Sequence, residues 1–388
     1  MIEKLKFSLK QEQFPYNIIK IQTLEHLNLS NNFLQRVPDG IFQLGGLQVL
    51  SMRGNELTTL PINWACLNTL VHFDCTLNPL ATVPAPLREC RRLEELLINA
   101  CELSEIPEWL GGLGTLRLLG LSGNKLQQIP VSLCQLSNLV YLGLFDCGLT
   151  VLPDEIVQLE SLQTLGINHN ALRELPIELS MLPLDTLDVR NNPLESLPPG
   201  LKRVRLDAEQ VQNLSSQMSE WSGLRLLSLE DCALTTLPDG IEHLSELEIL
   251  ILSENDLRQL PDYLGNMPNL RELNVWCNPL ESLPDTLMAL TVDYDLFERF
   301  EDTIVNMSTL RHFGLVENTL MVVPPSLRNL TQLESLDLRG NDIVEIPLWL
   351  GDLTGLRGLN MDGNPLSMKS LQTFQNAYPH IQVQFTPE

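Results

Sequence analysis

Apolar positions recur along this chain with a fixed period of 23 residues. Residues 116–130 read LRLLGLSGNKLQQIP, which is one copy of the pattern L-x-x-L-x-L-x-x-N-x-L-x-x-(L/I)-P. A shift of 23 residues in either direction reaches another copy, at Leu93 or at Leu139. Such a period predicts a solenoid, in which each unit packs only against its neighbours. The first leucines of the sixteen units are Leu24, Leu47, Leu70, Leu93, Leu116, Leu139, Leu162, Leu184, Leu201, Leu224, Leu247, Leu270, Leu287, Leu310, Leu333 and Leu356.

The first, fourth and sixth positions of each unit are apolar and alternate with outward positions. This alternation is typical of a short strand with one buried face. We expect the strands to stack in parallel into a sheet along the inside of an arc. The third, fifth and seventh positions would then line its concave side.

The ninth position is asparagine in eleven units. An amide side chain donates and accepts hydrogen bonds, so a buried column of amides can satisfy the backbone groups released where each strand turns away. Cys101, Cys147 and Cys232 stand at this position in three other units, and we interpret them as substitutes in the same ladder rather than redox or metal sites. The asparagines are Asn32, Asn55, Asn78, Asn124, Asn170, Asn192, Asn255, Asn278, Asn318, Asn341 and Asn364.

Prolines such as Pro107, Pro153 and Pro347 follow the ladder position at a constant distance. Proline fixes φ and lacks an N–H, so it can begin a short helical turn on the convex side. The units that start at Leu184 and Leu270 have only 17 residues, and each is followed by a unit that lacks both the ladder asparagine and the proline. Residues 207–223 and 293–309 of those following units predict longer amphipathic helices.

We therefore expect one continuous domain with three parts. Residues 1–23 form an N-terminal cap that includes an alternating run at Leu5, Phe7 and Leu9, residues 24–366 form the array with irregular units at 184–223 and 270–309, and residues 367–388 form a C-terminal cap. The C-terminal cap should contain a closing helix and an edge strand near residues 381–385.

Charge and cysteine content then narrow the class of partner. A formal charge of -24 opposes binding to nucleic acid and favours a basic or mixed-charge protein. The eight cysteines are spread through the array without a C-x-x-C pair, which is typical of a reducing compartment. No apolar run approaches the roughly 18 residues of a membrane span. We expect a cytoplasmic protein without signal peptide or disulfide caps, monomeric by itself, and delivery into a host cell as an effector stays an open alternative.

The pattern LxxLxLxxNxLxxLPxxIxxLxx resembles the 23-residue intracellular class of leucine-rich repeats over residues 24–366. Similar arrays occur in plant Ras-group-related and Ras-binding leucine-rich-repeat scaffolds, in Roco proteins and in bacterial leucine-rich-repeat proteins. The short units, with PLESLPPGLKRVRL, are also similar to effectors of the IpaH and Xanthomonas kind. The resemblance implies an α/β solenoid of horseshoe shape, with a parallel β-sheet on the concave face, short helices on the convex face and a role in binding proteins.

Catalytic motifs are missing from the sequence. It contains no H-E-x-x-H and no G-x-S-x-G, and the six histidines are far apart along the chain. We therefore predict no enzyme, no cofactor and no metal site.

Outward positions on the concave side supply the candidate binding residues. Glycine occupies the fifth position of three successive units, which predicts a floor without side chains beside the aromatic residues of one strand. The alternative is that glycine only relieves crowding on a curved sheet. A second aromatic pair and a strip of charges that changes sign, including Arg203, Asp293 and Glu317, follow along the chain. The candidates are Gly120, Tyr141, Gly143, Phe145, Gly166, Asn168, His169, Arg190, Arg205, Glu230, Asp231, Glu254, Trp276 and Tyr294.

The sequence thus favours a non-catalytic scaffold that holds a folded protein partner on its concave face, as an inhibitor, an immunity-type protein or an adaptor. The alternative is an effector, or the separately encoded substrate-recognition arm of a ligase or GTPase assembly. Neither the partner nor the source organism follows from the residues.

Overall fold

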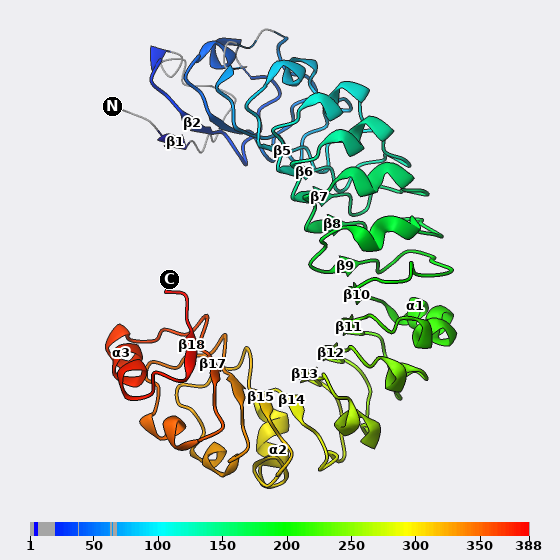
Figure 1. Cartoon of the computed structure of the whole chain (residues 1–388). Coiled ribbons are helices and arrows are strands. Elements are labelled where there is room, and N and C mark those ends of the chain that lie inside the picture. Colours follow the sequence, from blue (N-terminus) through cyan, green and yellow to red (C-terminus); the bar gives the residue numbers. More distant parts are fainter. Residues whose placement is uncertain (1–3, 7–19, 38, 63, 65–67, 388) are drawn as a thin grey trace. The chain divides into compact units, whose positions relative to one another are not determined.

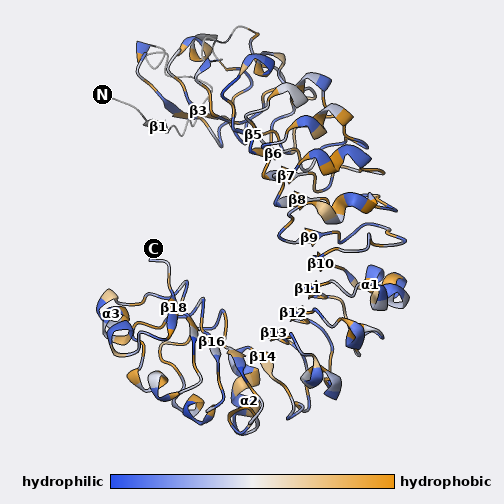
Figure 2. Ribbon diagram, in the orientation of Figure 1, coloured by the Kyte–Doolittle hydropathy of each residue, from blue (hydrophilic) through white to orange (hydrophobic). Residues whose placement is uncertain are grey.

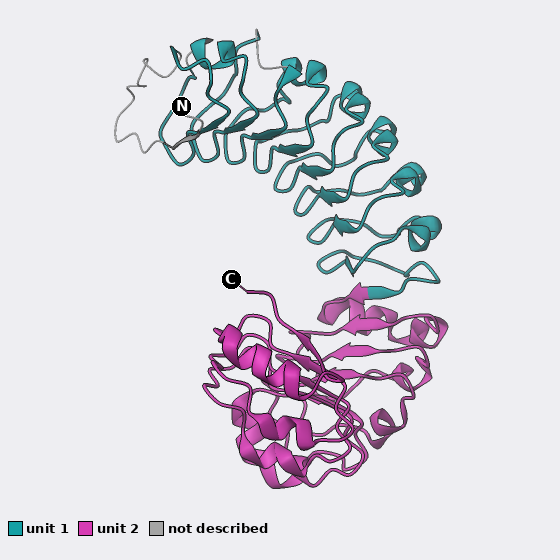
Figure 3. Cartoon of the chain, turned by 60° about the vertical axis from the view of Figure 1, so that its left-hand side comes forward, with its two compact units in different colours: residues 1–203 teal, residues 204–388 magenta. Residues whose placement is uncertain are grey.

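The computed structural model describes residues 4–6, 20–37, 39–62, 64 and 68–387 of the chain. The chain forms two compact units, residues 1–203 and residues 204–388 (Figure 3). We call them unit 1 and unit 2, and each is a solenoid with strands along one side and helical turns along the other (Figure 1). The division falls inside the strand β10 (Arg203–Arg205), in the first of the two repeats that lack both the ladder asparagine and the proline.

Unit 1 contains one short strand per repeat. All of these strands pair in parallel with the next, with successive repeats in register; for example, Gly120 lies beside Gly143 and Gly143 beside Gly166. The strands are β1 (Lys4–Lys6), β2 (His26–Asn28), β3 (Val49–Ser51), β4 (His72–Asp74), β5 (Glu95–Leu97), β6 (Leu118–Gly120), β7 (Tyr141–Gly143), β8 (Thr164–Gly166) and β9 (Leu187–Asp188).

Unit 2 repeats the arrangement. Its parallel strands are the end of β10, then β11 (Leu226–Ser228), β12 (Ile249–Ile251), β13 (Glu272–Asn274), β14 (Ala289–Thr291), β15 (His312–Gly314), β16 (Ser335–Asp337), β17 (Gly358–Asn360) and β18 (Gln382–Gln384). The expected edge strand near residues 381–385 is therefore β18, which pairs with β17.

Most repeats carry a single 3-10 turn on the side opposite the strands, rather than an α-helix. Proline precedes many of these turns and its carbonyl accepts the first bond, as from the Leu110 N–H to the Pro107 oxygen at 3.0 Å. The turns are η2 (Asp39–Gln43), η4 (Ala85–Glu89), η5 (Glu108–Gly112), η6 (Val131–Gln135), η7 (Asp154–Gln158), η8 (Ile177–Met181), η9 (Ser215–Glu220), η10 (Ile241–His243), η11 (Asp262–Asn266), η12 (Pro325–Asn329) and η13 (Leu348–Asp352).

Three α-helices lie where the sequence predicts longer helices, and all are in unit 2. They are α1 (Ala208–Leu214), α2 (Tyr294–Val305) and α3 (Met368–Ala377). Each shows both hydrophilic and hydrophobic residues in Figure 2, as expected for helices with one buried face. Asp207 and Asp293 cap α1 and α2 from the seventh position of their repeats, so each helix occupies the segment where the ladder asparagine would otherwise stand.

The asparagine ladder forms as predicted. The Asn124 side-chain oxygen accepts the N–H groups of Cys101 and Leu103, both at 3.0 Å, and its amide donates to the Ile98 carbonyl at 3.0 Å. Cys147 takes the same place one repeat later, with Sγ 3.3 Å from the Leu121 carbonyl oxygen. Cys101 and Cys232 make equivalent contacts, so all three cysteines belong to the ladder.

The residue before the ladder position adopts a left-handed conformation, which the residue pattern does not predict. Its φ is positive in every repeat that does not start an α-helix at that point, and ranges from +48° at Cys277 to +70° at Gly123. Leu77 and His169 adopt it as well, although such a conformation costs a non-glycine residue roughly 1–2 kcal/mol. The ladder bonds that follow hold the chain in this turn.

The predicted division into two caps and a continuous array stays a prediction. Most of the N-terminal cap, including Phe7 and Leu9, lies outside the described residues. Of its described part, β1 pairs in parallel with β2.

Candidate functional site

Two of the candidate rings lie on the strand face of unit 1. Tyr141 is 37% exposed and Phe145 is 39% exposed, whereas Leu142 and Leu144 between them are fully buried. The outward third and seventh positions thus hold the two rings at the surface, as the alternation predicts. Neither ring fills the core, and their exposure therefore contributes nothing to the packing of the repeat.

His169 fixes the orientation of the Phe145 ring from the next repeat. The two ring centroids are 4.8 Å apart with an edge-to-face angle of 67°. The Asn191 amide nitrogen lies 3.1 Å from the His169 Nε2, and Asn168 contributes a further amide 3.4 Å from Nδ1. We call Tyr141, Phe145 and His169 the aromatic patch, and these two amides form its polar border.

The predicted floor of bare glycines stays a prediction, and the space over the three glycines differs. A Cβ at Gly120 would come within 2.7 Å of the Leu97 side chain and within 2.8 Å of the Asn99 amide. A Cβ at Gly143 would come within 3.0 Å of the Ser122 hydroxyl and 3.1 Å of the Tyr141 ring. Only Gly166 has nothing closer than backbone atoms at 3.8 Å. Neighbouring side chains lie close to the first two glycines, which favours the alternative that glycine relieves crowding there.

Asn99 and Ser122 also have a structural task that explains their place beside the glycines. In many repeats a fifth-position Asn or Asp accepts the N–H two residues later, as Asp74 does from Thr76 at 2.9 Å. Glycine has no side chain to do this. The neighbouring repeat supplies the acceptor instead, since Asn99 accepts the Ser122 N–H at 2.9 Å and Ser122 accepts the Phe145 N–H at 3.2 Å.

The charged candidates differ in their exposure and in the partners that hold them. Arg190 is held by Asp188 through two contacts, Nε to Oδ1 at 3.0 Å and Nη2 to Oδ2 at 2.7 Å. Glu230 accepts a hydrogen bond from the Ser253 hydroxyl at 3.1 Å. Asp231 and Glu254 are exposed and Arg205 is half-buried. These residues come from both units, and a continuous charged footprint stays a prediction.

The second aromatic pair, Trp276 and Tyr294, is divided between a repeat and a helix. Trp276 is half-buried at a seventh position, and its indole Nε1 is buried with no hydrogen-bond partner in the described chain. Tyr294 is the first residue of α2 rather than part of a strand, and its ring lies 6.2 Å from Phe297. Trp276 therefore keeps an unused donor, at a cost of about 1–3 kcal/mol to the fold.

Unit 2 contains a polar hollow that the sequence interpretation missed. A cavity of about 190 Å³ lies over β12 to β16, with Glu272, Thr291 and Asp337 among its lining residues. The Thr291 side chain lies over Gly314, where a Cβ would come within 2.8 Å of the Thr291 hydroxyl. Arg339 reaches over it to Glu272 at 3.5 Å and to Asp337 at 3.6 Å. Adjacent charged or polar residues at the second and third positions, such as Arg271 with Glu272, are the signal that could have indicated it.

Burial controls protonation in this hollow. It raises the pKa of Glu272 despite the opposing effect of Arg339, and it raises the pKa of Asp337 against the hydrogen bond and charge of the same arginine. Burial also lowers the pKa of His312, whose Nδ1 lies 2.8 Å from the Ser335 hydroxyl. Within the described chain no carboxylate hydrogen bonds to the other imidazole nitrogen, so the pair lacks the orienting group of a hydrolytic triad, and we assign it no catalysis.

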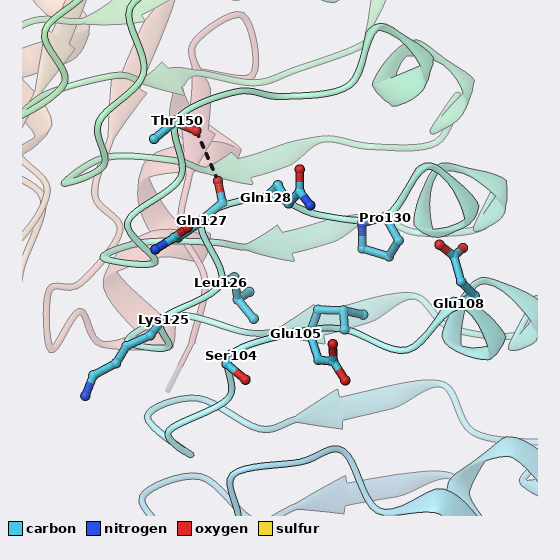
Figure 4. Close-up of a pocket in the computed structure, with 10 residues that line it drawn as sticks. Ser104, Glu105, Glu108, Lys125, Leu126, Gln127, Gln128, Pro130 and Thr150 are labelled. Carbon is cyan, nitrogen blue, oxygen red and sulfur yellow. Dashed lines mark hydrogen bonds between the residues drawn. The ribbon is translucent and has the colours of Figure 1, made fainter.

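A further cavity, in unit 1, lies away from every candidate residue. It measures about 650 Å³ and lies along the loops between the ladder and the 3-10 turns of unit 1, with Glu105, Lys125 and Gln128 in its wall (Figure 4). The Thr150 hydroxyl closes one side by donating to the Gln127 carbonyl at 3.5 Å. Its wall contains acidic, basic, amide and apolar side chains, and these do not form a cluster around one point where a ligand could bind.

Further features bear on metals, thiols and membranes. In the described part of the chain, no three His, Cys, Asp or Glu side chains gather as metal ligands. Seven cysteines are free, and only Cys277 among them is exposed, while Cys66 lies outside the described residues. None of the helices described has the length and apolar character needed to cross a membrane.

Comparison with known families agrees with the repeat pattern. A family model described as "Leucine rich repeat" matches residues 22–80, and a second model of the same description matches residues 332–353. The sequence matches no curated protein.

Solved structures with the same architecture cover nearly the entire chain. A leucine-rich-repeat protein of Leptospira interrogans is 25% identical, with a TM-score of 0.57 over 99% of this chain and 96% of that one. A TDR receptor is 24% identical, with a TM-score of 0.52 over 99% of this chain and 68% of that one. The second likeness concerns the fold alone.

Proposed function

The chain is a leucine-rich-repeat protein, and we propose that it acts as a non-catalytic scaffold that binds a folded protein partner through the strand face of unit 1. Arrays of this kind present extended surfaces suited to protein interaction. The observation that carries the proposal is the aromatic patch, in which Tyr141 and Phe145 are exposed on a strand whose neighbouring positions are fully buried.

Rings held in this way favour binding for two reasons. Aromatic side chains bury a large area and are frequent among the residues that dominate interface energy. His169 and its amide neighbours already hold the Phe145 ring in one orientation, so less conformational entropy is lost when a partner covers it. The amides of Asn168 and Asn191 can bond to polar groups around the covered ring.

The formal charge of -24 indicates the kind of partner. A basic or mixed-charge protein would be attracted to the array and an acidic one repelled, so charge would select partners and raise the association rate. We favour the role of an inhibitor, immunity-type protein or adaptor. The recognition arm of a ligase or GTPase assembly, or a delivered effector, is the alternative.

The test is differential capture from native lysate with two matched variants. Phe145→Asp places a charge in the aromatic patch, and Ile177→Asp places one at a 59% exposed position at the start of η8, on the opposite side of the repeat. We expect a protein retained by wild type and by Ile177→Asp but lost from Phe145→Asp. For that protein, isothermal titration should give at least about a 30-fold weaker affinity, as for an interface hot spot.

Equal retention by both variants at wild-type affinity, with unchanged circular dichroism, would remove the aromatic patch from the interface. The identity of the captured protein separates the roles. An enzyme whose activity falls on binding supports inhibition, whereas a ligase or GTPase subunit supports the recognition arm.

A further inference from the structure

A second cavity in unit 2 has an unusual charge for this molecule. It measures about 580 Å³ and lies at the edge of the sheet where β13 to β17 begin. Arg271, Arg311 and Arg357 line it with one carboxylate, Glu334, and we call it the arginine cavity. Its wall thus has an excess of two positive charges in a chain with a formal charge of -24. A concave site of opposite sign to its surroundings concentrates anions.

The repeat places these arginines at regular intervals. All three stand at the second position of their units, separated from one another by Met288 and by Glu334. Neighbouring strands lie about 4.8 Å apart, so successive arginines start roughly 10 Å apart. The outer two, Arg271 and Arg357, start roughly 20 Å apart, and Arg311 stands between them in the wall of the same cavity.

The guanidinium groups are only partly neutralised. Arg311 Nη1 lies 2.8 Å from Glu334 Oε1, and both side chains are about half exposed. Arg357 donates to the Thr354 and Leu356 carbonyls at 2.9 and 3.0 Å, which leaves its charge uncompensated. Arg271 is exposed, and the hydrogen bonds found for it within the described chain involve its backbone N–H. Two arginines can thus donate to a bound anion without breaking an ion pair.

His312 joins the cavity from the third position beside Arg311. Burial lowers the pKa of His312, and the charges of Arg271 and Arg311 lower it further, while Glu334 has the opposite effect. These effects favour the neutral imidazole, which lies within electrostatic reach of both arginines. A bound anion would raise its pKa, because an opposite charge favours the protonated ring.

Other charged groups around His312 are offset by partners of their own. Glu272 and Asp337, on the hollow side, share Arg339, and Glu248 lies 3.7 Å from Arg225. The groups that face His312 are Glu248, Arg271, Glu272, Arg311, Glu334, Asp337 and Arg357. The excess positive charge remains on the side of the arginine cavity.

We propose that the arginine cavity binds a phosphate group, free or carried by a small molecule, through Arg271, Arg311 and Arg357 with His312 beside them. Planar guanidinium forks match phosphate oxygens in pairs, and a phosphomonoester has a charge close to the excess on the wall. The volume is in the range of small-molecule sites. No residue is shared with the aromatic patch, so the site stands or falls independently of the proposed partner interface.

Isothermal titration of the full chain with inorganic phosphate, near neutral pH and at low ionic strength, tests the proposal. We expect saturable one-to-one binding that Arg271→Gln weakens about tenfold, as for the loss of one charge-assisted bond. Arg117→Gln is the matched control, since Arg117 has the same second position in a repeat of unit 1, is exposed and does not line the cavity. Its affinity should stay within about twofold of wild type. No saturable binding by wild type, or equal weakening by both variants, would overturn the site.

A pH series with sulfate gives a readout that general surface charge would not produce. Sulfate keeps its double charge at mildly acidic pH, so only protein groups titrate. Because the free protein has a lowered His312 pKa that an anion raises, affinity should increase as the pH falls from neutral to mildly acidic. His312→Gln should abolish that increase, and a retained increase would exclude His312 from the site.

Glycerol 3-phosphate in place of inorganic phosphate then distinguishes a carried phosphate group, which would bind more tightly, from the free ion.

Discussion

At the scale of single residues, the ninth position shows how much one side chain can do. The Asn124 side-chain oxygen accepts hydrogen bonds from two backbone N–H groups of the preceding repeat. Its amide nitrogen donates a hydrogen bond to a backbone carbonyl of that same repeat. Cysteine can replace only part of this, since the Cys147 thiol contacts the Leu121 carbonyl at 3.3 Å and has only a weak donor. Asparagine and cysteine at the ninth position should therefore contribute unequally to the free energy of unfolding.

Replacement of these two ladder residues should expose the difference. Asn124→Ala leaves buried N–H and C=O groups unpaired, so we expect the free energy of unfolding to fall by about 3 kcal/mol. Cys147→Ala, in the next unit, should cost about 1 kcal/mol. Urea unfolding followed by circular dichroism measures both, and equal costs would contradict the unequal roles.

At the scale of elements, one acid fixes the start of α2 within the array. Asp293 accepts the Leu296 N–H at 2.8 Å to cap α2, and its other oxygen accepts the Cys277 N–H of the preceding repeat at 2.9 Å. It thereby caps the helix and does the work of the absent ladder asparagine. The loss of asparagine and proline in this unit is a consequence of starting a helix one turn earlier.

Asp293→Ala should therefore lower the free energy of unfolding by about 2 kcal/mol, through the lost cap and the unpaired Cys277 N–H. Asp295→Ala removes an exposed acid from the same first turn and should cost only about 0.3 kcal/mol. Thermal or urea unfolding of the two variants compares them. Similar losses would mean that helix charge, rather than capping, stabilises α2.

At the scale of the whole molecule, stability should be local, because each repeat contacts only its neighbours. We expect Asn124→Ala to increase amide hydrogen exchange in peptides that span β5 to β7, where its ladder bonds lie. Peptides that cover β15 to β18 should keep wild-type protection. Mass spectrometry of exchanged peptides resolves this, and loss of protection throughout both units would show that the chain opens as one cooperative body.

The candidate site was predictable in part. Alternation placed the Tyr141 and Phe145 rings on the strand face, because side-chain period in a strand does not depend on the sequence of neighbouring repeats. The floor over Gly120 and Gly143 was not predictable, because its filling depends on which rotamers Leu97, Asn99 and Tyr141 adopt. The arginine cavity was also missed, since residues 271, 311 and 357 look like unrelated surface charges until strands bring them to one edge.

The sequence by itself determined the repeat, its strand register, the asparagine ladder and the places of the long helices, because each depends on periodic burial or on one local capping group. The tertiary structure decided what occupies the surface between repeats. The left-handed turn before the ladder, the side chains over the glycines and the charge of the arginine cavity all depend on residues of different repeats that lie side by side. A linear pattern orders such residues but does not give the direction of their side chains.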